Sequence, residues 1–169
     1  MNSQAALLVQ QLDLTPHPEG GYYREIYRAP LDVQSPMHAG MRSAFTSIHF
    51  LLADAQYSAW HRVASDETWF FHLGCELKIY SLLPTGQGHA SVVETQTLGP
   101  ESGRFEVTIP AGNWFAAKPV RDDDFSLVSC VVSPGFLFED FELADQDKLL
   151  ALGYGNTPDW PFLGSLLIR

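Results

Sequence analysis

Positive charge is scarce in this sequence of 169 residues. It has 10 lysines and arginines against 20 aspartates and glutamates, which gives a formal net charge of −10 at pH 7. A protein that binds a nucleic-acid backbone needs a clustered basic face, and no run of basic residues supplies one here. The same acidity disfavours an anionic membrane surface. We therefore predict that neither a nucleic acid nor a membrane is a partner.

Cysteine is also rare, and long apolar segments are missing. Cys75 and Cys130 are too few for a disulfide scaffold and match no CxxC spacing. No apolar stretch approaches the ~18 residues that a membrane-spanning helix needs. The first residues lack the basic region, the apolar run and the cleavage site of a secretory signal. These absences predict a protein of the reducing cytoplasm.

The chain nevertheless has enough apolar material for one core. Hydrophobic residues make up 46% of it and charged residues 18%, which excludes intrinsic disorder as the main state. The length suits a single domain over residues 1–169.

Short runs rich in β-branched and aromatic residues dominate the middle of the chain, and Gly, Pro, Asp and Ser separate them. The run over residues 104–109 alternates between polar and apolar residues, which indicates a half-buried strand. Many short strands with turn signals between them predict an all-β sandwich or barrel. The expected strands cover residues 22–28, 43–52, 57–63, 67–73, 76–83, 90–98, 104–109, 113–117 and 125–132.

Helices are expected only near the two ends of the chain. Residues 3–12 can form one, with Ser3 as its cap. Residues 140–152 can form another, which Gly153 ends. Two long loops remain, at 29–42 and 85–89, and the first is expected to lie over the mouth of a barrel.

Residues 58–74 carry the most informative pattern, SAWHRVASDETWFFHLG. His61 and Glu67 are separated by an even number of positions, so on two strands joined by a tight turn they point into the same interior. The side chains of Val63, Trp69 and Phe71 share that parity. Two interpretations stay open. The first is a dry pocket in which pKa values shift and acid–base chemistry becomes possible. The second is a buried His–Glu pair in which the two side chains bond only to each other and have a structural role.

This segment resembles the first motif of the cupins, in which two histidines, a glutamate and a glycine lie on two strands of a small barrel. His61, Glu67 and Gly74 match that motif, whereas Val63 replaces the second histidine. Residues 110–112, Pro-Ala-Gly, resemble the second motif, and its histidine position falls on Phe115.

The resemblance implies a metal site of three histidines and one glutamate in metal-binding cupins, and only His61 and Glu67 remain here. Open catalytic metal sites generally keep three protein ligands. We therefore predict no tightly bound metal and no other cofactor. If a metal binds, His61 and Glu67 are its expected ligands, and a rearranged site with His49 or Glu19 is the alternative.

Four blocks in order are similar to one uncharacterised bacterial and fungal cupin family: HPEGGYY from His17, WHRxxSDE from Trp60, PAGxW from Pro110 and SPGFxFEDF from Ser133. The similarity covers about residues 12–152. It implies an RmlC-like cupin jelly-roll barrel with short N-terminal and C-terminal helices, and a homodimer. It brings no established reaction.

Several further residues are candidates for the site, each with a structural alternative. Glu19 is expected to cross the barrel mouth, because the two glycines after it let the backbone approach a ligand. Arg24 is either a clamp for an anionic group or a solvent-facing strand residue. Aromatic side chains are mostly expected in the core, and a ligand-facing wall is the alternative. The remaining candidates for ligand binding are Ser58, Trp69, Trp114 and Phe115.

Three hypotheses for function follow from these residues. The first is a metal-independent epimerase or isomerase that acts on a sugar or a similar polar metabolite. By analogy within the fold, His61 is its base, Glu67 orients His61, and Tyr22 or Tyr23 returns a proton. The second is a non-catalytic protein that binds or senses a metabolite in the same cavity. The third, a metal-dependent cupin enzyme, is the one that the replaced ligands disfavour.

Overall fold

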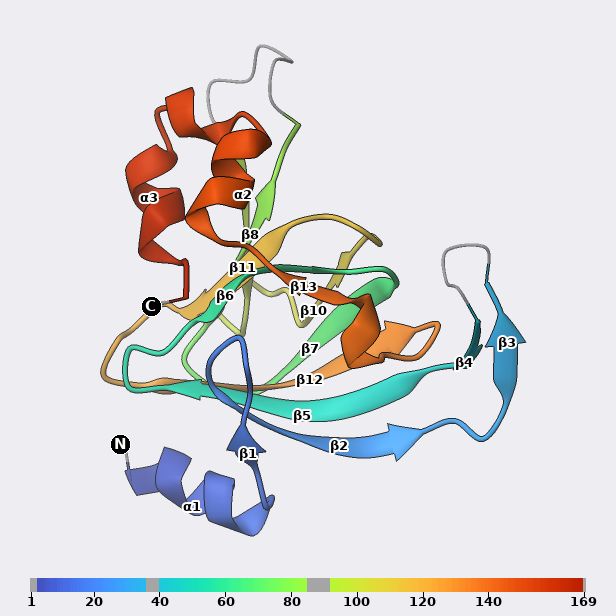
Figure 1. The fold of residues 1–169 in the computed structure, drawn as a ribbon. Coiled ribbons are helices and arrows are strands. Elements are labelled where there is room, and N and C mark those ends of the chain that lie inside the picture. The colour runs from blue at the N-terminus through green and yellow to red at the C-terminus, as the bar shows by residue number, and fades with distance from the viewer. Residues whose placement is uncertain (1–2, 36–39, 85–91, 169) are drawn as a thin grey trace.

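Two antiparallel β-sheets face each other and carry short helices at both ends of the chain (Figure 1). This arrangement comes from a computed structural model that describes residues 3–35, 40–84 and 92–168. The larger sheet has six strands in the order β1-β2-β5-β12-β7-β10. The smaller sheet has five strands in the order β13-β6-β11-β8-β9, and β3 pairs only with β4.

The larger sheet consists of β1 (Thr15–Pro16), β2 (Tyr22–Arg28), β5 (Thr46–Ala53), β12 (Phe125–Ser133), β7 (Asp66–Gly74) and β10 (Glu106–Ile109). The smaller sheet consists of β13 (Phe141–Leu143), β6 (Ser58–Val63), β11 (Phe115–Pro119), β8 (Leu77–Leu82) and β9 (Val93–Leu98). Every run predicted to be a strand coincides with one of these strands to within a few residues. The all-β prediction is therefore confirmed.

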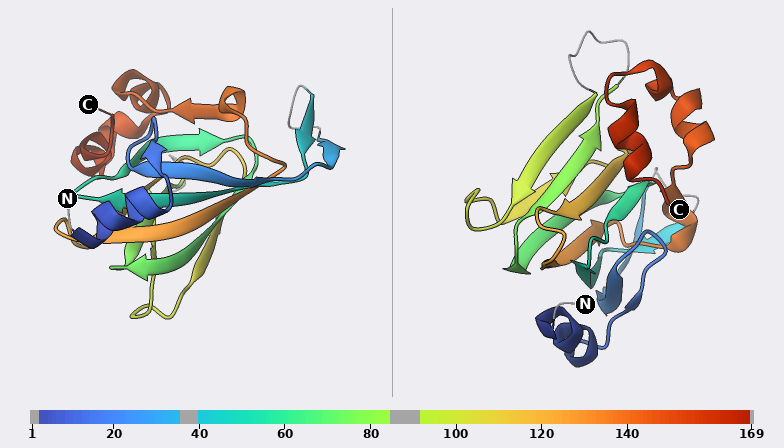
Figure 2. Two further views of the ribbon diagram at one scale, coloured as in Figure 1. Left: turned by 90° about the horizontal axis from the view of Figure 1, so that it is seen from below. Right: turned by 90° about the vertical axis from the view of Figure 1, so that its left-hand side faces the viewer.

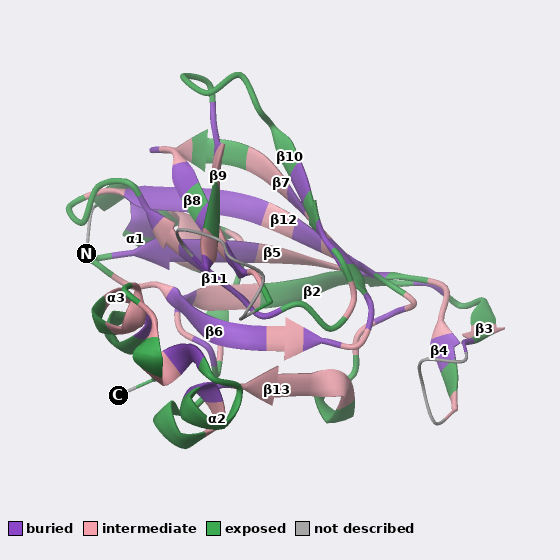
Figure 3. Ribbon diagram, turned by 90° about the horizontal axis from the view of Figure 1, so that it is seen from above, coloured by how far each residue is buried: buried purple, intermediate pink, exposed green. Residues whose placement is uncertain are grey.

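The main core lies between the inner faces of the two sheets (Figure 3). Strand β10 shows why the sequence pattern works: Val107 and Ile109 are buried, and Glu106 and Thr108 are exposed. Large side chains from several strands fill the space, among them Phe50, Trp69 and Phe115. Cys75 and Cys130 are both buried.

Each terminal segment covers the outside of one sheet. Helix α1 (Ser3–Gln11) packs on the larger sheet, where Ala5 joins a cluster with Leu51, Phe125 and Leu127. Helices α2 (Gln146–Ala151) and α3 (Trp160–Ser165) cover the smaller sheet. No helix in the described ranges has both the length and the hydropathy that crossing a membrane requires.

The helix expected over residues 140–152 is only partly present. A 3-10 turn, η1 (Phe138–Asp140), and strand β13 come first, and the helix begins at Gln146, after the Asp145 side chain accepts a hydrogen bond from the Lys148 amide at 2.7 Å. The prediction was wrong for residues 141–143 because they pair with the edge of β6, a long-range contact that overrides local helix propensity. Gly153 ends the helix with a φ of 88°, as expected. A second 3-10 turn, η2 (Tyr154–Asn156), and α3 were not predicted.

The loop expected at 29–42 is instead largely an arm, the ribbon formed by β3 (Asp32–Gln34) and β4 (Met41–Ser43). It projects away from the two sheets in Figure 1 and in the left view of Figure 2. The expectation that it lies over the barrel mouth is therefore wrong for the described part of the arm. The other expected loop, 85–89, falls outside the described residues.

Candidate functional site

A cavity of about 340 Å³ opens between the two sheets. The inner faces of β2, β5, β6, β7 and β12 contribute to its walls, and so do the turn at 17–19 and the segment 136–141. Its polar lining includes His17, Glu19, His61 and Glu67. Sequence positions that are far apart thus meet in one enclosed space, which is of the size that small-molecule sites usually have.

A tight turn places Glu19 in this cavity. The His17 amide donates to the Gly21 carbonyl at 3.0 Å, and the Gly20 amide donates to the His17 carbonyl at 3.1 Å. Gly20 adopts a φ of 110°, and a side chain there would collide with the carbonyl oxygen of Tyr57. Glycine is therefore required at this position by both backbone conformation and space. The consequence is that Glu19 reaches inward and is only 5% exposed.

The Glu19 carboxyl group is the centre of a small polar cluster. The Ser58 hydroxyl donates to its Oε1 at 2.8 Å. Its Oε2 lies 3.3 Å from Nε2 of His61 and 3.6 Å from Nδ1 of His17. Burial raises the pKa of Glu19 well above its usual range, and the nearby Glu67 carboxylate raises it further.

The backbone sets the orientation of His61. Its Nδ1 lies 2.7 Å from the Ala59 carbonyl oxygen, so Nδ1 carries the proton and donates it. Nε2 is left as an acceptor that faces Glu19. Burial lowers the pKa of His61 to about 3, and the imidazole is therefore neutral at neutral pH. Burial likewise lowers the pKa of His17 to about 4.

Glu67, on β7, is the second carboxyl group of the cavity. It is 7% exposed, and burial raises its pKa to about 7, while the Cys130 thiol opposes that shift by donating a hydrogen bond. Glu67 does not take the place beside His61 that the even spacing suggested. The carboxyl group within ion-pair distance of His61 belongs to Glu19.

The other candidates from the sequence fall into three groups. Tyr23 and Arg24 line the cavity. Phe115 and Trp69 lie behind it: the Phe115 ring centroid is 4.0 Å from that of His61, and Trp69 packs edge-on against Phe115. Tyr22 and Trp114 lie outside the barrel, Tyr22 against the cluster under α1 and Trp114 beneath the C-terminal helices.

Sequence reasoning missed one wall of the cavity. Phe136, Phe138 and Phe141 form this wall, and Cys130, which also belongs to the core cluster, lines the cavity from β12. The three phenylalanines belong to the SPGFxFEDF block, in which aromatic residues recur after a Pro-Gly turn. That block was the available signal for an aromatic wall, but the order of its residues does not show which element the rings face.

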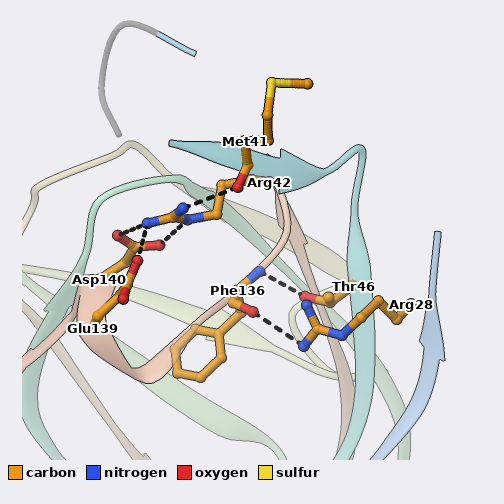
Figure 4. Close-up of polar contacts among 7 residues, drawn as sticks. All are labelled: Arg28, Met41, Arg42, Thr46, Phe136, Glu139 and Asp140. Atoms are coloured by element: carbon orange, nitrogen blue, oxygen red, sulfur yellow. Dashed lines mark hydrogen bonds and ion pairs between the residues drawn. The ribbon is translucent and has the colours of Figure 1, made fainter. Parts of the chain in front are cut away.

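Two arginines hold this aromatic wall in place (Figure 4). The guanidinium group of Arg42 binds both oxygens of Asp140, at 2.7 and 2.9 Å, and donates to Glu139 at 2.5 Å. Arg28 donates to the Phe136 carbonyl at 3.1 Å, and the Phe136 amide donates to the Thr46 hydroxyl at 3.0 Å. Arg42 belongs to the arm, so the arm is connected to the cavity through this contact.

The donor set does not fit the metal site of metal-binding cupins. Val63 lines the cavity, and Phe115 packs on His61. Within the described ranges, no group of three or more His, Cys, Asp or Glu side chains is arranged to hold a metal ion. His61 directs one ring nitrogen at a backbone carbonyl and the other at Glu19. These residues therefore do not fit a metal ion held as metal-binding cupins hold it.

Two antiparallel sheets that enclose a cavity lined by a histidine of β6 and a glutamate of β7 define a cupin. The chain belongs to the family described as "Cupin superfamily (DUF985)", whose model matches residues 6–144. This confirms the resemblance drawn from the four sequence blocks.

Solved structures of relatives agree with this assignment. A hypothetical protein from Leishmania major has 32% identity and a TM-score of 0.83, with 98% of this chain and 99% of that one covered. Protein SO0799 from Shewanella oneidensis has 38% identity and a TM-score of 0.81, with 98% and 97% covered. An uncharacterised Saccharomyces cerevisiae protein is 28% identical over 165 residues, which cover 84% of this chain and 76% of that protein.

A more distant structure supports the fold alone. The cupin 2 domain-containing protein from Halorhodospira halophila has 13% identity and a TM-score of 0.54 over 92% of this chain and 88% of that one. The predicted cupin architecture is thus confirmed. None of these relatives brings a specific activity.

Proposed function

We propose that this protein binds a small polar metabolite in the cavity and catalyses a metal-independent proton transfer on it, as an epimerase or isomerase does. The observation that carries the proposal is Glu67, a buried carboxyl group that lines the cavity and whose pKa burial raises to about 7. A general acid–base group is most effective when its pKa lies near the working pH. Glu67 therefore exchanges a proton readily at neutral pH.

The roles of the other residues follow from their protonation. Because the pKa of His61 is lowered to about 3, we assign the base to Glu67 rather than to His61. The Glu67 carboxylate removes a proton from a carbon next to a carbonyl group and later releases it to water. Tyr23, the candidate tyrosine that lines the cavity, donates the returning proton and is reprotonated by water. His61 and Glu19 orient a polar group of the ligand.

Solvent-deuterium incorporation tests this proposal. The molecules that co-purify with the protein are first identified by mass spectrometry, and each is then incubated with the protein in D₂O. We expect one deuterium at the carbon next to a carbonyl group with wild type and loss of that exchange in Glu67→Gln. The matched control is Glu106→Gln, an exposed glutamate on β10. Exchange that persists in Glu67→Gln would remove Glu67 from the reaction.

A non-catalytic binding or sensing protein is the second candidate. It is favoured by the polar cluster itself, in which both nitrogens of His61 already face partners within the protein. Under this alternative the co-purified molecule binds but takes up no deuterium. A metal-dependent enzyme is the third, and elemental analysis that finds about one transition metal ion per chain after dialysis would favour it over the first two.

We further propose that the protein is a cytoplasmic homodimer. Large apolar side chains are exposed on the arm and on the strands that lead to it, where a second copy would cover them: Ile26, Tyr27, Leu31, Met41 and Phe45. A patch of this kind often marks a protein interface. Both cysteines are free and buried, which is typical of a reducing compartment.

A further inference from the structure

The charged side chains that line the cavity are unbalanced. Four of them are acidic and two are basic: Asp13, Glu19, Glu25, Glu67, Arg24 and Arg28. The excess of acidic side chains lies in the interior of the cavity and not at its rim.

The rim is neutral overall. Arg28 pairs with Glu25 at 2.7 Å, and Arg24 lies 3.9 Å from Asp13. The side chains of Arg24 and Arg28 are 46% and 37% exposed, so water also solvates them. These arginines are not free to neutralise an acid in the interior.

Among the residues that the structure describes, the interior holds two carboxyl groups and no permanent cation. Glu19 and Glu67 are 5% and 7% exposed. In the described part of the chain, no lysine or arginine lies within ion-pair distance of either one, and the nearest titratable nitrogens of Glu19 are those of two histidines. Buried carboxylates are costly unless they are paired. Burial therefore favours the protonated form of each group, which is the direction in which both pKa values move.

Aromatic side chains surround the same space. Phe50, Phe136, Phe138, Phe141 and Tyr23 line the cavity together with the two glutamates. Aromatic surfaces attract organic cations, and they exclude the water that a small inorganic ion would need. Together, carboxyl groups without a lysine or arginine partner and aromatic walls match a cation that carries carbon substituents.

We propose that the cavity binds a ligand with a protonated amine or quaternary ammonium group, which the carboxylates of Glu67 and Glu19 neutralise while the aromatic side chains enclose its carbon substituents. The inference rests on the proposed function only in that a small molecule occupies the cavity. It does not depend on catalysis. The expected ligand class is therefore an amino sugar, an amino alcohol or a similar cationic metabolite rather than an anionic one.

A pair of isosteric probes tests this inference on the wild-type protein. Choline and 3,3-dimethylbutan-1-ol have nearly the same shape, but only choline is charged. Calorimetry at mildly alkaline pH, where Glu67 is ionised, is expected to show at least about tenfold tighter binding of choline. Sodium and potassium chloride, as inorganic cations, are expected not to displace it except by general screening.

Variants extend the test. Glu67→Gln is expected to remove the preference for choline, and the exposed control Glu106→Gln is expected to retain it. A thermal melt shows whether each variant is folded. If Glu67→Gln does not fold, the comparison of the two probes on the wild-type protein still tests the inference. Equal binding of both probes would overturn the inference that the ligand is cationic, and it would leave the proposed binding of a small molecule intact. If neither probe binds and nothing co-purifies, both this inference and the proposed function fail.

Discussion

The side chain of His61 contacts several other groups in the site. Its ring packs on Phe115 and Phe141, its Nδ1 donates to the Ala59 carbonyl, and its Nε2 faces Glu19. We predict that His61→Ala lowers the free energy of unfolding by about 1–3 kcal/mol, because the buried Ala59 carbonyl and Glu19 lose a partner. The same change is expected to abolish binding of the co-purified ligand.

Thermal melts with and without ligand measure both effects. The control is His72→Ala, an exposed histidine on β7 whose replacement is expected to change stability by less than about 0.5 kcal/mol. A His61→Ala protein that binds its ligand normally would contradict the assignment of His61 to the site.

A second prediction for a single residue concerns Glu67 and the pH dependence of stability. Its pKa rises from a usual 4.5 to about 7 on folding, so the folded state binds more protons than the unfolded state between these pH values. The contribution of Glu67 to stability is therefore fully present below about pH 4.5 and is lost as the pH rises through 7. At about 1.4 kcal/mol per pKa unit, the loss is about 3 kcal/mol.

The wild-type curve alone does not isolate this effect. His17 and His61 have lowered pKa values and contribute the opposite slope, since their stability is lost as the pH falls. The difference between Glu67→Gln and wild type cancels the contributions of the histidines: denaturant titrations are expected to show the variant gaining stability relative to wild type from pH 4.5 to above 7. The difference curve for Glu106→Gln is expected to be flat. A flat curve for Glu67→Gln would show that Glu67 is not perturbed.

At the scale of elements, the link between the arm and the aromatic wall is the feature with a testable consequence. Arg42 on β4 holds the η1 turn through Asp140 and Glu139. We predict that Arg42→Met raises amide hydrogen exchange across residues 136–141 by at least about tenfold and weakens ligand binding, because the wall loses its anchor.

Hydrogen-exchange mass spectrometry checks this prediction. Asp140→Asn is expected to give the same result, and the double variant is expected to add little, since both changes break one interaction. The control is Arg121→Met, which removes an exposed ion pair elsewhere on the surface. Unchanged protection of residues 136–141 in Arg42→Met would contradict the anchoring role.

For the whole molecule, the arm predicts the oligomeric state. Leu31, just before β3, and Met41, on β4, are 66% and 50% exposed, and the ribbon of these two strands extends from the barrel. We predict a dimer at micromolar concentration in sedimentation experiments and a monomer for the double variant Leu31→Asp/Met41→Asp, with an unchanged thermal midpoint per chain. Phe105→Asp, an exposed apolar residue just before β10 at the other edge of the larger sheet, is the control and is expected to stay dimeric. A wild-type monomer would overturn the proposal.

The sequence by itself determined the strands, the cupin architecture and the burial of His61 and Glu67. These features are local: alternation places side chains on one face of a strand, and glycine and proline mark the turns between strands. The C-terminal segment marks the limit of such reasoning. Its residues 141–143 join a sheet edge that is formed by residues nearly eighty positions away, and local propensity does not register that partner.

Only the tertiary structure decided which groups meet in the cavity. Strand parity gives the face on which a side chain lies, but not its neighbour from another element. The turn at residues 17–21 is distant in sequence from β6, yet it brings Glu19, rather than Glu67, to His61. The same holds for Phe136, Phe138 and Phe141, which close the site where Arg42, Arg28 and the pairing of β13 with β6 hold their segment across long sequence distances. The protonation states follow from that enclosure, since burial is a property of the assembled fold and not of any segment.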